Sequence, residues 1–63
     1  MIAVEYSARQ DCFNIDTLEN ILKTNIRQMK QKIDCDYRII AIVNNYQEAN
    51  KICEKAREII NKE

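Results

Sequence analysis

The 63-residue sequence contains no glycine, no proline and no histidine, and each absence excludes a class of site. Without histidine, a serine or cysteine nucleophile has no ordinary side-chain base to activate it. Without glycine, there is no flexible loop that lets a phosphate approach the backbone closely. Without glycine or proline, a long loop or an interdomain hinge is not expected. The sequence therefore predicts a single domain, residues 1–63, that is not an enzyme.

The sequence contains three cysteines, an odd number. Cys12, Cys35 and Cys53 include no C-x-x-C pair, and a structural zinc ion normally takes four cysteine or histidine ligands. Cys35 lies between Asp34 and Asp36, whose charges disfavour a reactive thiolate. Two carboxylates alone also fall short of a divalent cation site. We therefore expect no metal, no other cofactor and a reducing, cytoplasmic setting.

Charge and hydropathy argue against two further classes of partner, nucleic acid and membranes. Ten basic and ten acidic residues cancel, so no overall field attracts the chain to nucleic acid or anionic lipid. No apolar run approaches the roughly 20 residues of a membrane span. The opening residues, MIAVEYSARQ, lack the basic and apolar regions of a signal peptide. We expect no association with a membrane.

Three segments have the pattern of β-strands. Residues 2–8 alternate between apolar and polar positions, which predicts a half-buried strand. Residues 12–15 suggest a short return strand with Phe13 and Ile15 inward, although the turn before it lacks a strong hairpin signal. Residues 37–44 are apolar on both sides, which predicts a strand buried on both faces.

The first helix is predicted over residues 17–33. Asp16 followed by Glu19 resembles a capping box, with aspartate in the usual serine or threonine role. Apolar residues then recur at three- and four-residue spacing, which predicts one buried stripe formed by Leu18, Ile21, Leu22, Ile26, Met29 and Ile33. With no glycine present, Asp34 or a neighbour must supply any left-handed residue after the helix.

The second helix is predicted from about Tyr46 to Asn61. Asn45 can accept hydrogen bonds from the first turn, and Glu48 can reach back to the Asn45 backbone. This reciprocal capping disfavours an anion site at the same helix terminus. The predicted inward residues are Ala49, Ile52, Cys53, Ala56, Ile59 and Ile60.

The element order β(β)αβα predicts a small α+β fold. We expect a two-layer sandwich, with two helices packed on one face of a two- or three-stranded sheet. The uncovered face would then expose either Ile40 and Ile42 or the side that carries Tyr37. Because so short a chain buries only about 60% of its surface, we expect this face to pair with a second copy.

A basic strip lies on the first predicted helix. Residues 17–33 carry a net charge of +3, and Lys23, Arg27 and Lys30 follow helical spacing along one side. Such a strip is typical of a solvated face, but it could also contact an acidic protein surface or nucleic acid phosphates.

Together these features favour a non-enzymatic protein-interaction module, homodimeric, that inhibits or regulates a larger bacterial machine. A phage-type anti-defence protein is one example of this class. The expected contact residues are Lys23, Arg27, Lys30, Tyr37, Ile40 and Ile42. One alternative is a nucleic-acid-binding accessory protein that uses the basic strip. Another is a small-ligand binder, with a pocket between protomers lined by Tyr37, Tyr46 or Asn44.

Overall fold

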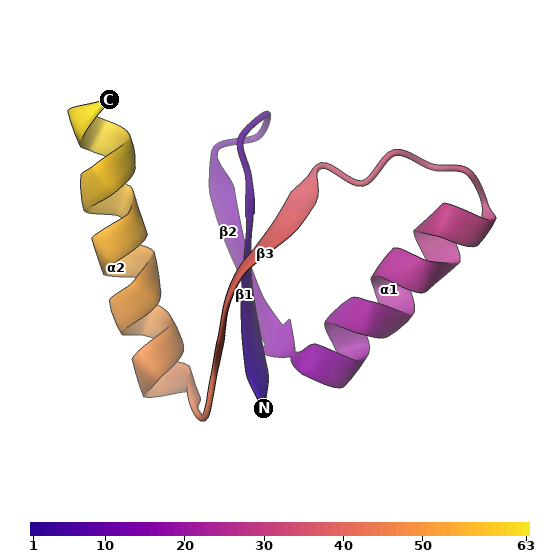
Figure 1. Ribbon diagram of the computed structural model, residues 1–63, viewed down its shortest axis with the longest axis horizontal. Helices are drawn as coiled ribbons and strands as arrows, with labels where there is room; N and C mark the ends of the chain where they lie inside the picture. The colour runs from indigo at the N-terminus through magenta and orange to yellow at the C-terminus, as the bar shows by residue number, and fades with distance from the viewer.

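A three-stranded antiparallel sheet lies between two helices in the computed structural model, which describes residues 1–63 (Figure 1). The sheet order is β2-β1-β3, with β1 paired to both neighbours. The α+β class and the predicted element order are confirmed, including a second strand. The elements are β1 (Ile2–Ser7), β2 (Cys12–Thr17), α1 (Leu18–Lys30), β3 (Tyr37–Val43) and α2 (Tyr46–Lys62).

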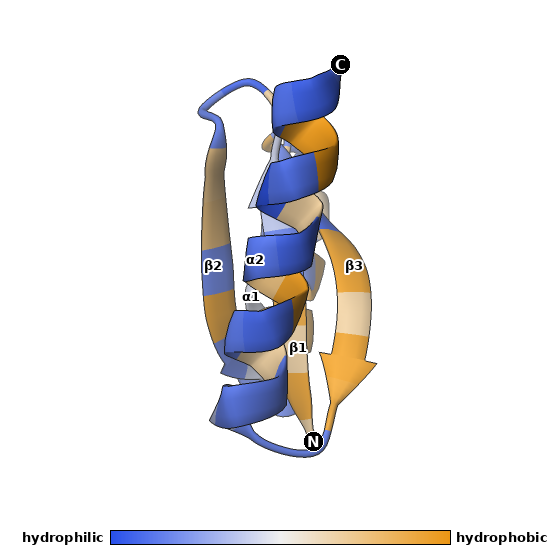
Figure 2. Cartoon of the chain, turned by 90° about the vertical axis from the view of Figure 1, so that its left-hand side faces the viewer, coloured by the Kyte–Doolittle hydropathy of each residue, from blue (hydrophilic) through white to orange (hydrophobic).

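The two helices lie on opposite faces of the sheet. Figure 1 shows the sheet edge-on with α2 on one side and α1 on the other, and in Figure 2 α2 lies in front of the strands and α1 behind them. This placement differs from the predicted packing on one face. As a result, residues on both faces of the central strand β1 are buried.

β1 is buried on both faces, although its alternating pattern predicted a half-buried strand. On the α1 side, Ala3 and Ser7 are fully buried and Glu5 is nearly so. The Glu5 carboxylate accepts a hydrogen bond from Asn14 Nδ2 at 2.7 Å, whereas its second oxygen has no protein partner. Polarity therefore did not predict exposure here, because the flanking strands and α1 enclose the central strand.

The main core lies between β1 and α2. Ile2 and Val4 pack against Ala49, which is fully buried in the second turn of α2. Burial also raises the pKa of the Cys53 thiol, as expected for a core cysteine. The predicted inward face of α2 is confirmed except for Ile59, which is exposed. Half-buried residues around this core are Phe13, Ile15, Ala41, Val43, Ile52 and Cys53.

The predicted cap of α2 is confirmed. Asn45 Oδ1 accepts a hydrogen bond from the Glu48 backbone N–H at 2.9 Å. The Glu48 side chain was expected to accept from the Asn45 backbone N–H. Its Oε2 instead accepts from the Asn44 N–H at 3.2 Å. The first-turn donors are thus partly satisfied within the chain.

The predicted cap of α1 is wrong by one residue. Thr17 is the N-cap, and its Oγ1 accepts from the Asn20 backbone N–H at 3.2 Å. Asp16 instead belongs to β2, since that strand extends to pair along the full length of β1. Glu19 forms an ion pair with Lys23 and no return hydrogen bond to the cap.

Candidate functional site

β3 carries the most apolar sequence of the sheet, yet it is an edge strand. Ile39, Ile40 and Ile42 are 37–48% exposed, and in Figure 2 the strand forms an open apolar border of the sheet. The predicted burial of residues 37–44 on both faces is therefore wrong for these side chains. The reason is position: β1 pairs with only one edge of β3, and α1 does not cover the strand. We call this region the β3 edge surface.

The exposed isoleucines project to both sides of the sheet. Ile39 and Ile42 lie opposite Glu5 and Ala3, so they face the α1 side. A β-bulge interrupts the ladder between Val4 and Glu5 and leaves Ile40 without an opposite residue. The Ile40 side chain lies on the α2 side, where it lines a groove.

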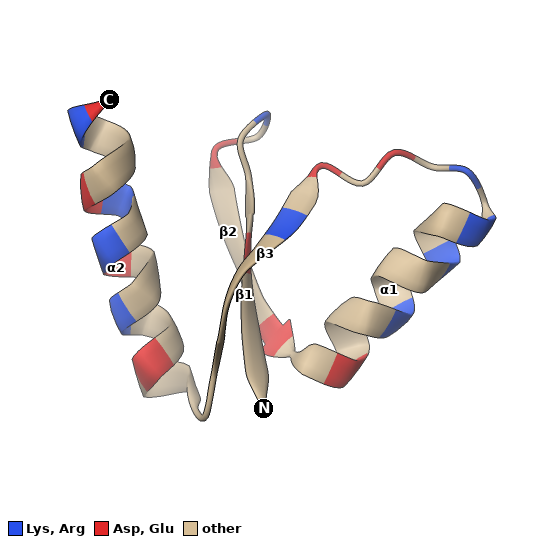
Figure 3. Cartoon of the chain, viewed as in Figure 1, with Lys and Arg blue, Asp and Glu red and all other residues tan.

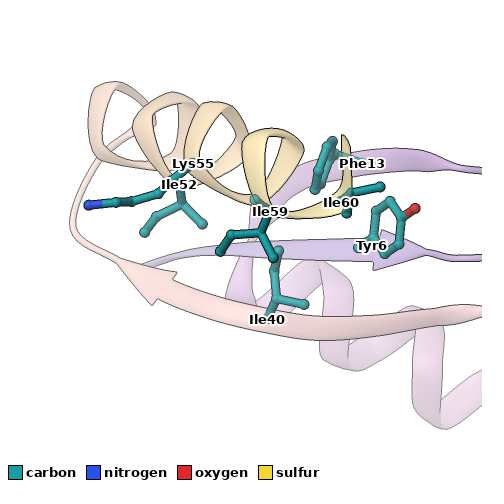
Figure 4. Close-up of a pocket in the computed structure, with 8 residues that line it drawn as sticks. Tyr6, Phe13, Ile40, Ile52, Lys55, Ile59 and Ile60 are labelled. Carbon is teal, nitrogen blue, oxygen red and sulfur yellow. The ribbon is translucent and has the colours of Figure 1, made fainter. Parts of the chain in front are cut away.

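This groove lies between the sheet and the second half of α2. It has a volume of about 400 Å³, and Lys55 is its one residue that is not hydrophobic. Figure 4 shows Ile59 and Ile40 pointing toward each other where the groove meets β3. The groove therefore continues the β3 edge surface on the α2 side. Its lining residues are Tyr6, Phe13, Ile40, Ile52, Lys55, Ala56, Ile59 and Ile60.

A hydrogen-bonded cluster includes Tyr6, which lines the groove, and ties the β1–β2 turn to α2. Tyr6 donates to Asp11 Oδ1 at 2.6 Å, and Arg57 Nη1 donates to the same oxygen at 2.8 Å. The Arg57 guanidinium also lies 5.1 Å from the centre of the Phe13 ring. Asp11 has a positive φ of 53°, a conformation that aspartate tolerates better than most residues.

This cluster predicts a loss of stability in acid. The hydrogen bond from Tyr6, and then that from Arg57, hold the pKa of Asp11 below its ordinary value of 3.8. A lowered folded-state pKa stabilises the fold fully above about pH 4, and this contribution disappears as the pH falls through that pKa. We expect Asp11→Asn to flatten the acid side of the thermal-midpoint profile, measured by circular dichroism from roughly pH 2 to 6.

The matched control is Glu54→Gln, which removes an exposed carboxylate that has no ion pair. This variant should keep the acid dependence of the parent protein. An equal flattening in both variants would contradict a specific role for Asp11.

α1 carries the predicted basic strip on one side. Lys23, Arg27 and Lys30 line a shared surface hollow together with Ile26. Lys23 pairs with Glu19 at 3.2 Å within the helix, whereas Arg27 and Lys30 form no ion pair. The strip is therefore brought together as expected, and two of its three cations are free.

The predicted buried stripe of α1 is largely wrong. Ile21 is the one buried residue of the helix, at 3% exposure, whereas Leu22, Ile26 and Met29 are 43–67% exposed. The helix also ends at Lys30, three residues before the expected end. Lys32, with a φ of 58°, takes the left-handed position expected of Asp34 or a neighbour.

The polar groups of Tyr37 and Asn25 are engaged inside the protein. The Tyr37 hydroxyl lies 3.0 Å from Cys12 Sγ, a hydrogen bond that raises the pKa of Tyr37. Its half-buried ring is therefore less accessible than Ile40 or Ile42. Asn25, which is half-buried on α1, accepts a hydrogen bond from Cys35 Sγ at 3.4 Å.

The molecule has more surface than its size requires. Its accessible area is 4942 Å², compared with about 4,250 Å² for a typical 7.5 kDa monomer. The excess is roughly 700 Å². Its radius of gyration is 12.1 Å, against about 10.6 Å for a compact domain of this length. Figure 1 shows the cause, because α1 slants away from the sheet.

Comparison with known proteins yielded no matching family model, no matching curated protein and no matching solved structure. Neither helix combines the length and the apolarity needed to cross a membrane. The candidate site therefore depends on the geometry of this chain alone. Sequence reasoning missed the groove and the Asp11–Arg57 contact, because both join segments far apart in the chain, 46 residues in the case of Asp11 and Arg57, and no local pattern marks them.

Proposed function

We propose that the protein is a non-enzymatic interaction module that dimerises through the β3 edge surface and inhibits or regulates a larger protein by covering part of it. The single observation that carries this proposal is the exposure of Ile39, Ile40 and Ile42 along a free strand edge. Native proteins usually protect such an edge with charge, proline or a covering segment. Here Arg38 is the only charged residue of β3.

A second copy at the edge is the best cover because the isoleucines project to both faces. A partner stacked on one face would leave either Ile40 or the pair Ile39 and Ile42 in water. A strand edge can also pair with itself across a two-fold axis, so that each protomer covers the other with the same surface. The bulge at Ile40 interrupts a regular ladder, so side-chain burial is expected to contribute most of the association energy.

The opposite edge is less suited to this role. β2 includes the polar residues Asn14, Asp16 and Thr17 among its six residues, and Asn14 is exposed.

We expect the wild-type protein to have the mass of a dimer by light scattering at micromolar concentration, and the Ile40→Asp/Ile42→Asp variant to have the mass of a monomer. Aspartates at both positions would place uncompensated charges on either side of the paired edges. Both side chains are exposed in the isolated chain, so circular dichroism should show an intact fold.

The control is Leu22→Asp/Ile26→Asp, which places the same charges on exposed apolar residues of α1 and should leave the dimer intact. A monomeric wild-type protein, or an unchanged mass in the folded β3 variant, would show that the β3 edge surface is not the dimer interface.

A further inference from the structure

α1 directs most of its hydrophobic residues away from its own sheet. Leu22, Ile26 and Met29 follow at spacings of four and three residues, so they form one line along the helix. All three are exposed, and the exposed fraction rises from 43% at Leu22 to 67% at Met29. We call these three residues the α1 apolar line.

The less exposed side of α1 is apolar in its first half, at Leu18 and Ile21, and polar in its second half. Ile21 is buried, but Asn25 and Gln28, which continue its side of the helix, are amides that are only partly exposed. Gln28 Oε1 is buried without a protein partner. A helix selected only to cover this sheet would be expected to place its apolar residues on that side instead.

Unpaired cations lie beside the α1 apolar line. Arg27 and Lys30 share a surface hollow with Ile26 and form no ion pair. Figure 3 shows basic positions at intervals along α1, whereas basic and acidic positions mix on α2. Residues 17–33 have a net charge of +3, so the remainder of this neutral chain carries −3. The apolar and basic surfaces of α1 therefore form one combined feature.

We propose that α1 docks into a groove on a different protein, one with an apolar floor for Leu22, Ile26 and Met29 and with carboxylates along the rim beside Arg27 and Lys30. Anchors at positions i, i+4 and i+7 are the usual pattern of a helix bound in a groove. This inference rests on the proposed role as an interaction module but not on the β3 dimer, because the two surfaces share no residue.

Other occupants fit these observations less well. The protein's own apolar groove includes Lys55, which forms no ion pair, so a second copy would bring like charges together. Nucleic acid binding commonly uses about six or more phosphate contacts and makes no use of an apolar line. A membrane-surface helix requires a broader apolar face than one line of three residues.

The test uses a photo-crosslinking amino acid at Gln31, next to the α1 apolar line, in a lysate of the organism that encodes the protein. Mass spectrometry identifies the crosslinked protein and peptide, and calorimetry with that purified protein then gives the affinity. We expect the crosslinked peptide to lie in an acidic groove. Ile26→Asp should weaken binding at least about 30-fold, as for the loss of a central anchor. Arg27→Glu/Lys30→Glu should weaken it and reduce its salt dependence.

Lys51→Glu/Lys62→Glu makes the same charge change on α2 and is expected to leave the affinity unchanged. Circular dichroism confirms the fold of each variant. The titrations are repeated in the Ile40→Asp/Ile42→Asp background, where retained binding separates docking by α1 from dimerisation through β3. A monomeric wild-type protein that still binds through α1 would overturn the dimer and support this inference.

Three results would overturn it. The first is the absence of any crosslinked protein at low salt. The second is equal affinity of the purified partner for the parent protein and the α1 variants. The third is an effect of the α1 substitutions confined to phosphatidylglycerol vesicles or to duplex DNA, which would assign α1 to a membrane surface or to nucleic acid.

Discussion

Replacing Ile21 by alanine is expected to lower the free energy of unfolding by about 2–5 kcal/mol, the range for truncating a buried isoleucine. Ile21 is 3% exposed and is the one buried residue of α1. Small domains have little stability in reserve, so this loss is a large share of the total. Urea unfolding followed by circular dichroism measures it, with the midpoint and slope fitted separately.

Ile26→Ala is the matched control, because it makes the same substitution on the same helix at an exposed position. We expect a loss of less than about 1 kcal/mol, as for most surface changes. Similar losses at Ile21 and Ile26 would contradict the orientation of α1 and would favour the continuous buried stripe that its sequence predicts.

Enlarging Ala49 to leucine is expected to destabilise the fold by about 1–3 kcal/mol through overpacking. Ala49 is fully buried where α2 crosses Ile2 and Val4, so three additional carbon atoms have no space without a shift of the helix. Leucine and alanine have similar helix propensities, which removes local helix formation as the cause. Thermal and urea unfolding measure the change.

Ala56→Leu tests the same substitution two turns later. Ala56 is half-buried and lines the open groove of about 400 Å³, so a leucine side chain can extend into that space. We expect a change within about 0.5 kcal/mol. If Ala49→Leu were tolerated as well as Ala56→Leu, the close contact between α2 and β1 would be wrong.

The candidate site was only partly predictable from the sequence. The apolar strand and the basic strip follow from local patterns, whereas the exposure of Ile40 and Ile42 does not. That these isoleucines lie at a sheet edge depends on β1 pairing with both β2 and β3. Strand order is a long-range property, and periodicity along a strand carries no information about which neighbour it acquires.

For α1 as well, the sequence predicts one feature of the surface and the tertiary structure decides another. Helical spacing places Lys23, Arg27 and Lys30 on one side, and the structure brings them together. The rotation of the helix about its own axis does not follow from this spacing. Hydrophobic periodicity predicted that Leu22, Ile26 and Met29 would be buried, but contact with the sheet at Ile21 turns this line outward.

The sequence by itself determined the element order, the Asn45 cap of α2 and the apolar strand at residues 37–43. These features depend on interactions within a few residues, such as capping and side-chain periodicity. Only the tertiary structure decided that the helices cover opposite faces and that the most apolar strand stands at an edge. These features depend on competition between distant segments for the two edges and two faces of β1, which no local pattern records.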